Sequence, residues 1–256
     1  SVLMTAALLA LMGCATSPKS LVYPYGVFDA PVKVETRRLP KDPLNPQAKP
    51  HITCTRYSAF TITEVDLGEK GAEKLAITPV ETKCAVETAG EIRIPLEGYF
   101  KGVIGDYIFF DASDGWDGGV PFTVFSPKGD KLFEDSVENG EFALARREGA
   151  VLSMRYTRVF HAPCSLYERT AQCDGEVTSL TGLGGEGASP ATEIPDCKAV
   201  YDAELKKTAP EYVEALKASP SVLHYPVELT FDGAQLTIMP SGWAPVPPLP
   251  TPAWHR

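Results

Sequence analysis

The chain has 256 residues, of which 44% are hydrophobic, and its formal net charge at pH 7 is −9. This length suits one large domain or two small ones, and the hydrophobic content is sufficient for a substantial core. The acidic balance argues against a nucleic-acid partner, because such proteins bind phosphates through basic patches. It also argues against peripheral binding to anionic lipid headgroups.

The first residues form a short apolar segment. From Val2 to Gly13 no residue carries a charge. A membrane-spanning helix needs about twenty apolar residues, so this run is too short to span a bilayer. It does fit the hydrophobic core of a signal peptide. We therefore expect residues 1–13 to be a signal peptide.

The order Leu11-Met12-Gly13-Cys14 resembles the lipobox of bacterial lipoproteins. The resemblance implies cleavage before Cys14, a diacylglyceryl group on the Cys14 sulfur and acylation (palmitate) of the new amino terminus. Ala15 follows where inner-membrane lipoproteins often carry aspartate, so the resemblance points to the outer membrane, with the protein facing the periplasm. The alternatives are an ordinary secretory leader cut near Ala15 and a buried amino-terminal segment.

Five further cysteines are candidates for disulfide bonds, which are the usual state of cysteines in exported proteins. They are Cys54, Cys84, Cys164, Cys173 and Cys197. The preferred pairs are Cys54–Cys84 and Cys164–Cys173, leaving Cys197 free. A pairing of Cys173 with Cys197 is nearly as favourable, and all six cysteines can pair if Cys14 carries no lipid.

We expect a mainly β fold, either an antiparallel sandwich or a strongly curved sheet. Residues 14–50 hold the lipidated cysteine and a proline-rich tether or loosely structured arm, because proline recurs too often there for helix. Residues 51–160 form the β domain. Its predicted strands are 91–96 and 151–158, which alternate, 107–110, which is buried on both faces, a hairpin over 121–133 turning at 127–130, and a further strand over 141–147.

Residues 161–256 are expected to form a smaller, disulfide-stapled α/β portion packed on the β domain. Residues 161–195 look irregular, and a helix is predicted near 196–207. The motif Thr208-Ala-Pro-Glu211 matches a capping box, which predicts a second helix with Tyr212, Val213 and Leu216 on its buried face and Pro220 as its stop. A hairpin over 227–238 turning at Asp232-Gly233 and an extended proline-rich tail complete the chain.

The most suggestive internal segment is the loop Asp111–Gly119. Its oxygen-bearing side chains are of the type that calcium prefers: Asp111, Ser113, Asp114 and Asp117. The spacing is not that of an EF-hand, and the simpler interpretation is a solvated turn. Trp116 has the shape to stack on a sugar ring, but we expect it to fold onto the core.

Other candidate sites are weaker. His161 with Cys164 and Cys173 has the chemistry of a metal site, although a disulfide is the better role for these cysteines. His51, His224 and His255 are isolated in the sequence. Residues 182–187 fit the letters of a dinucleotide fingerprint, but no strand–helix context surrounds them, so a flexible loop is expected.

The sequence contains no Gly-x-Ser-x-Gly elbow. The leading hypothesis is a non-enzymatic, lipid-anchored binding or assembly subunit of the cell envelope, with a protein partner there. One alternative is an exported hydrolase whose site is assembled across strands, in a cleft that gathers His161 or His224 with carboxylates or a serine. The other is calcium-dependent glycan binding through residues 111–119.

Overall fold

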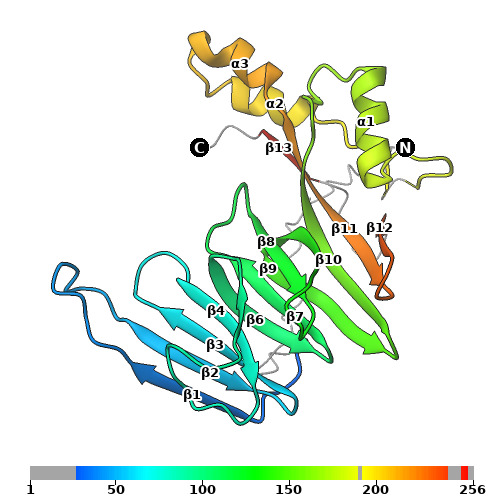
Figure 1. Cartoon of the computed structure of the whole chain (residues 1–256). Coiled ribbons are helices and arrows are strands. Elements are labelled where there is room, and N and C mark those ends of the chain that lie inside the picture. Colours follow the sequence, from blue (N-terminus) through cyan, green and yellow to red (C-terminus); the bar gives the residue numbers. More distant parts are fainter. Residues whose placement is uncertain (1–26, 190–191, 242–248, 253–256) are drawn as a thin grey trace, which may run out of the picture.

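The computed structural model describes residues 27–189, 192–241 and 249–252. The predicted signal peptide, Cys14 and His255 lie outside these residues, as does most of the proline-rich tail. The described part is mainly β, as expected, with two antiparallel sheets and a group of short helices at one end (Figure 1). None of its helices has the length and apolar character needed to cross a membrane.

The first sheet has five strands in the order of the chain. They are β1 (Lys33–Arg38), β2 (His51–Arg56), β3 (Phe60–Asp66), β4 (Lys74–Pro79) and β5 (Ile92–Ile94).

Strand β1 lies inside the segment predicted to be a tether, and that prediction is wrong for these residues. Its side chains are almost all exposed, so burial is not what defines the strand. It forms because its backbone pairs with β2 over six positions, from Lys33–Arg56 to Arg38–His51. Charged side chains are common on such an open edge, where they oppose aggregation.

The second sheet has eight strands. Seven of them follow the spatial order β12-β11-β10-β9-β8-β7-β6, and the eighth, β13, pairs with β11. They are β6 (Gly98–Ile104), β7 (Tyr107–Ala112), β8 (Gly119–Phe125), β9 (Lys131–Glu148), β10 (Val151–His161), β11 (Ser221–Phe231), β12 (Leu236–Pro240) and β13 (Leu249–Pro252). The predicted hairpins are confirmed as β8–β9 and β11–β12. Because β11 pairs with β10 over ten positions, the carboxy-terminal part completes this sheet.

The segment 141–147 is not a separate strand, contrary to the prediction. It is the second half of β9, and both Asn139 and Gly140 have positive φ angles in the middle of that strand. The first half pairs with β8 and the second half mainly with β10. Asn139 and Gly140 therefore bend β9, so that its first half pairs with β8 and its second half mainly with β10.

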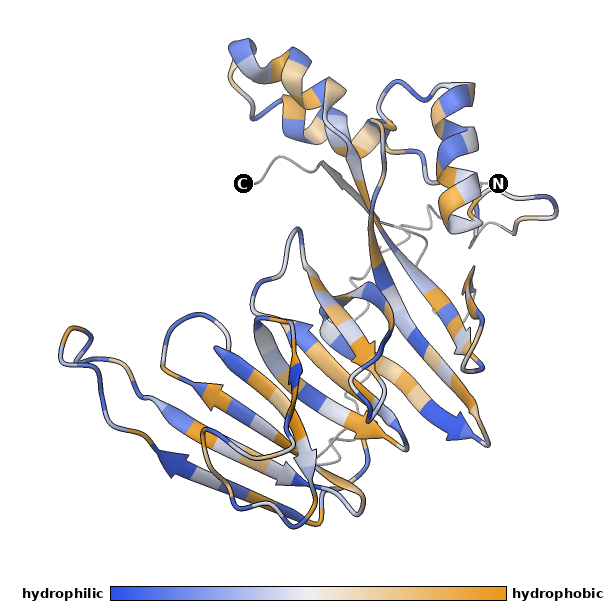
Figure 2. Ribbon diagram, viewed as in Figure 1, coloured by the Kyte–Doolittle hydropathy of each residue, from blue (hydrophilic) through white to orange (hydrophobic). Residues whose placement is uncertain are grey.

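The second sheet is strongly curved. The rings of Tyr107 on β7 and Phe231 on β11 lie 6.0 Å apart between centroids, although three strands separate them in the sheet. Phenylalanine rings line the concave side, among them Phe109, Phe122 and Phe133. The two-residue alternation along the strands is visible in Figure 2.

Strand β7 contributes to two hydrophobic cores, which confirms that it is buried on both faces. Tyr107 and Phe109 point into the concave side of the second sheet. Ile108 and Phe110 point the other way, where residues of the first sheet such as Ile62 pack against them. The first sheet therefore covers the outer face of this part of the second sheet.

Helix α1 (Ala171–Thr181) occupies a segment predicted to be irregular, and that prediction is wrong. Its buried residues, Cys173, Val177 and Thr181, recur every four positions. Two of the three are not strong hydrophobic residues, so the pattern is weak in the sequence. The helix begins at Thr170, whose hydroxyl accepts a hydrogen bond from the Cys173 amide, and ends at the left-handed Gly182.

The helix predicted near 196–207 is confirmed as α2 (Lys198–Leu205). The predicted capping box is wrong: the Thr208 hydroxyl donates back to the Glu204 carbonyl of α2 at 2.9 Å. A 3₁₀ turn, Pro210–Tyr212, leads into α3 (Val213–Ala218) without a side-chain cap. Leu216 is buried there, whereas Tyr212 is exposed.

Candidate functional site

Both preferred disulfides are present. Cys54 of β2 is bonded to Cys84 in the loop after β4, and Cys164 is bonded to Cys173 of α1. Cys197 is a buried free cysteine, and burial raises the pKa of its thiol to about 12. It is therefore protonated at neutral pH and unreactive as a nucleophile. Disulfides of this kind are typical of proteins in oxidising, extracytoplasmic compartments.

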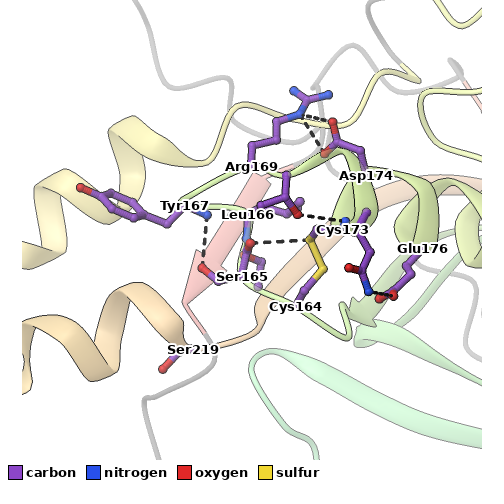
Figure 3. Close-up of a disulfide and its surroundings, with 12 residues drawn as sticks. Cys164, Ser165, Leu166, Tyr167, Arg169, Cys173, Asp174, Glu176 and Ser219 are labelled. Atoms are coloured by element: carbon purple, nitrogen blue, oxygen red, sulfur yellow. Dashed lines mark hydrogen bonds and ion pairs between the residues drawn. A yellow bond between two sulfur atoms is a disulfide. The ribbon is translucent and has the colours of Figure 1, made fainter.

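The Cys164–Cys173 disulfide fastens α1 to the segment that leaves β10 (Figure 3). Around it, Arg169 pairs with Asp174 at 2.8 Å, and the Ser165 hydroxyl accepts a hydrogen bond from the Tyr167 amide. Because both sulfur atoms are bonded to each other, they are not available as thiolate ligands beside His161. Cys164 and Cys173 therefore form a disulfide bond and do not ligate a metal.

The loop between β7 and β8 ends in a two-residue hairpin. Trp116 and Gly119 exchange two backbone hydrogen bonds of 2.7 and 2.8 Å. The residues between them, Asp117 and Gly118, have φ angles of 50° and 82°. Positive φ at both central positions is the signature of a type I′ turn, for which Asp-Gly is a favoured sequence. The interpretation of this segment as a turn is confirmed.

The structure does not bring the four candidate calcium ligands together. Asp111 pairs with Lys101 at 2.7 Å, and Asp114 pairs with Lys70. Burial raises the pKa of Asp111 in spite of the neighbouring lysine. Ser113 lies beside Gly71, and Asp117 turns to His161. Within the described ranges, no three histidine, cysteine or carboxylate side chains converge as a metal site would require.

Trp116 does not fold onto the core, contrary to the prediction, since 55% of its surface is exposed. The turn directs the neighbouring Asp117 carboxylate inward instead, where only 9% of that side chain is exposed. The hairpin thus presents an aromatic ring to the surface and buries a carboxylate directly after it.

A pocket of about 330 Å³ lies beside the indole. Its other lining residues come from three adjacent strands: Gly119 and Pro121 of β8, Ser136 of β9 and His161 of β10. The Pro121–Ser136 pair is in direct cross-strand register, which puts both side chains on the same face of the sheet. The volume is at the lower end of the range for small-ligand sites, roughly 300–1,000 Å³.

The Asp117 carboxylate lies behind the imidazole of His161. Its Oδ2 atom is 3.7 Å from Nδ1 of His161 and is buried without a hydrogen-bond partner among the described residues. Nδ1 is therefore the ring nitrogen of His161 that faces the carboxylate. A buried carboxylate is stable only where hydrogen bonds or opposite charges compensate its lost hydration.

A second histidine, His224 of β11, packs against the turn. Nδ1 of His224 on β11 lies 2.8 Å from Oε1 of Glu138, while its Nε2 is buried and has no partner in the described part of the chain. The strand register pairs Val159 with His224, so this histidine and His161 project from the same face of the sheet. A Cβ atom on Gly118 would lie 3.2 Å from Cε1 of His224, so the turn rests closely on this ring.

Ser136 and Glu138 are the site residues that the sequence analysis missed. They lie on alternate positions of β9, a spacing that every strand contains, so no local signal distinguishes them. His51 is not part of the cluster, since it contacts the Lys49 carbonyl in the first sheet. Residues 182–187 follow α1 as a loop, as expected, with Gly182 serving as the helix cap.

The chain was compared with protein families, with curated proteins and with solved structures. No family, no curated protein and no solved structure matches it. The function is therefore inferred from the residues and the geometry described above.

Proposed function

We propose that this protein is a lipid-anchored component of the bacterial cell envelope that acts as a non-enzymatic binding or assembly subunit. Lipid on Cys14 would hold it at the outer membrane, facing the periplasm. The observation that carries this proposal is the lipobox-like sequence Leu11–Cys14 ahead of a body that closes two disulfides. A lipidated cysteine carries more than one acyl chain, which is what stable anchoring requires.

Expression of the full chain in a Gram-negative bacterium, with its own or an added export signal, tests the anchor. We expect the wild-type protein to enter the detergent phase of a Triton X-114 partition and its intact mass to show a chain beginning at Cys14 with added acyl mass. The Cys14→Ser variant should be found in the aqueous phase. Cys197→Ser is a matched control, because Cys197 is a buried free cysteine and should not affect partitioning. A wild-type protein that partitions like Cys14→Ser would contradict the proposal.

The binding role is supported by the exposed Trp116 and the pocket beside it. An exposed aromatic residue next to converging polar groups is a common arrangement in recognition sites. Affinity purification from membranes in mild detergent, after brief cross-linking, should recover a stoichiometric envelope partner. Recovery of the tagged protein alone, as a monomer, would count against an assembly role.

A second candidate function, an exported hydrolase, is favoured by one specific observation. Ser136 and His161 line the same pocket, and the Asp117 carboxylate lies behind His161. These are the residue types of a serine nucleophile, a general base and the group that orients the base, which occur in several chain orders on unrelated folds. The site is assembled from a loop and two strands, as the hydrolase alternative requires.

Reaction with a fluorophosphonate probe distinguishes the hydrolase from the binding protein. An activated serine should be labelled in the native protein and not in Ser136→Ala, while Ser153→Ala serves as a control on the neighbouring strand. Absence of labelling, together with ester hydrolysis no faster than that of Ser136→Ala, would exclude the hydrolase.

A further inference from the structure

The pocket beside Trp116 has one rigid apolar wall. The indole is 55% exposed and shares the pocket with Pro121 and Gly119, which add apolar surface. Tryptophan offers a large contact area with few rotatable bonds, so little conformational entropy is lost when a ligand covers it. The wall suits a ligand that has a flat apolar face.

The remaining groups around the pocket are hydrogen-bonding groups. The Ser136 hydroxyl and the His161 imidazole line it directly. The Asp117 side chain, which is 9% exposed, directs an Oδ2 atom without a partner among the described residues toward the same imidazole. That distance of 3.7 Å is longer than a hydrogen bond, and the Oδ2 atom is buried, so the carboxylate faces the imidazole and not the ligand. A ligand hydroxyl can donate one hydrogen bond and accept another, and the Ser136 hydroxyl and the His161 imidazole are the lining groups it can meet.

The charges around the pocket disfavour anionic ligands. Asp117 and Glu138 bring negative charge, and the nearby lysines of the loop are already engaged, Lys70 by Asp114 and Lys101 by Asp111. The whole chain has a net charge of −9. Phosphates, nucleotides and acidic sugars would therefore meet repulsion, and no lysine or arginine is among the described residues that line the pocket.

A neutral pyranose ring has the complementary chemistry, with one apolar face and several hydroxyl groups. We infer that the Trp116 pocket is a binding site for a neutral saccharide that stacks on the indole and hydrogen-bonds to Ser136 and His161, with Asp117 behind the imidazole as a positioning residue. This inference rests on the proposed binding role and names its ligand class. It also requires no calcium, because the other loop carboxylates are paired with lysines.

Isothermal titration calorimetry on the full-length protein tests the inference, in a detergent without a sugar headgroup so that the micelle does not compete. The probes are the β-1,4-linked tetramers of N-acetylglucosamine and of glucose. We expect saturable binding of at least one tetramer, unchanged by calcium or a chelator. Trp116→Ala should weaken it about tenfold, which corresponds to about 1.4 kcal/mol, because the stacking contact with the aromatic ring is lost. Trp116→Tyr, which keeps a ring, should retain most of the affinity.

Ser136→Ala should weaken binding, and so should Asp117→Asn, which keeps a residue that tolerates positive φ but removes the negative charge behind His161. Asp114→Asn is the matched control in the same loop, because Asp114 pairs with Lys70, outside the pocket, and its affinity should equal that of the wild type. The inference is overturned by an absence of saturable heat with both tetramers up to roughly 10 mM. Equal affinity of Trp116→Ala, or loss of binding on chelation, would also overturn it.

Failure of this inference can be told apart from failure of the proposed function. If neither tetramer binds but Cys14-dependent partitioning and a stoichiometric partner are found, the envelope role stands and the saccharide does not. If a tetramer binds while Cys14→Ser partitions like the wild type, the lipid anchor is wrong and the saccharide site stands.

Discussion

Four residues form a buried polar network on the concave side of the second sheet. Asp135 of β9 accepts hydrogen bonds from the Tyr156 hydroxyl and, at 2.8 Å, from Nε of Arg158. Arg158 in turn donates to the Tyr225 hydroxyl at 3.1 Å. Asp135 and Arg158 are charged groups whose side chains are 6% and 17% exposed. The aromatic interior thus contains an ion pair whose lost hydration is offset by these hydrogen bonds.

Removing one partner of this pair should cost far more than removing an exposed one. We expect Asp135→Ala to lower the free energy of unfolding by about 3–5 kcal/mol, because Arg158 is left buried without its carboxylate. Glu134→Ala on the same strand removes an exposed pair with Lys131 and should cost no more than about 1 kcal/mol. Urea unfolding measures both. Equal losses in the two variants would show that the network contributes no more than a surface ion pair.

The same network predicts a loss of stability at alkaline pH. Burial raises the pKa of Tyr225 to about 12, and burial together with the neighbouring Asp135 raises the pKa of Tyr156 well above its ordinary value of 10.0. In the unfolded chain both tyrosines lose their protons near pH 10. Between pH 10 and pH 12 the folded state therefore binds more protons, so stability falls as the pH rises. Tyr225→Phe should flatten this slope in urea unfolding at pH 9, 10 and 11. A slope that Tyr225→Phe and Tyr156→Phe both leave unchanged would contradict the assignment.

At the scale of single residues, some side-chain pairings could be predicted from the sequence and others could not. Covalent pairing restricts partners to one residue type, so the sequence narrowed the disulfides to a few pairings; the observed Cys54–Cys84 and Cys164–Cys173 were the preferred ones, with Cys173–Cys197 nearly as favourable. The contacts of His161 with Asp117 and of His224 with Glu138 were not, because a chain with 33 acidic residues offers too many partners. Only the register of β9, β10 and β11 selects among them.

Among the elements, the β7–β8 hairpin determines the geometry of the candidate site. Its Asp117-Gly118 pair reverses the chain in two residues, exposes Trp116 and buries the carboxylate. The Gly118 carbonyl also accepts a hydrogen bond from the Asn139 amide at 2.9 Å. The turn is therefore fastened to the bend in the middle of β9.

The close packing of the turn against His224 can be tested with two glycine substitutions. Gly118→Ala places an L residue at a φ of 82° and a Cβ atom 3.2 Å from His224, whereas Gly233→Ala, at 97° in the β11–β12 turn, meets no atom within 4 Å. A left-handed conformation costs an alanine about 1–2 kcal/mol, so both variants should lose that amount. Gly118→Ala should lose more because of His224. Thermal unfolding measures the difference, and a Gly118→Ala variant as stable as Gly233→Ala would mean that the turn and His224 are not closely packed.

Elements with strong alternation were the predictable ones. The hairpins β8–β9 and β11–β12 combine alternating strands with turn residues, and both are confirmed. Strand β1 was missed because its exposed, charged side chains give no burial pattern, and its pairing with β2 is a long-range property of the backbone. Helix α1 was missed because a cysteine and a threonine occupy two of its three buried positions.

At the scale of the whole molecule, β7 joins the two sheets. Phe109 contributes to the core inside the curved sheet and Phe110 to the core shared with the first sheet, and both are fully buried. The fold class was predictable from strand patterns. The assignment of strands to two sheets was not, because it depends on which faces meet after the second sheet curves.

A strand shared by two cores should make unfolding cooperative. We expect Phe109→Ala and Phe110→Ala each to lower the free energy of unfolding by about 3–5 kcal/mol, the usual cost of truncating a buried phenylalanine. Each variant should still unfold in a single transition, monitored in parallel by near-ultraviolet circular dichroism and by hydrogen exchange of amides in both sheets. In Phe110→Ala the first sheet loses part of its contact with β7, so this variant is the stricter test of cooperative unfolding. If its first sheet exchanges earlier than the second, the two sheets are separate folding units and the candidate site, which lies wholly on the second, depends on that unit alone.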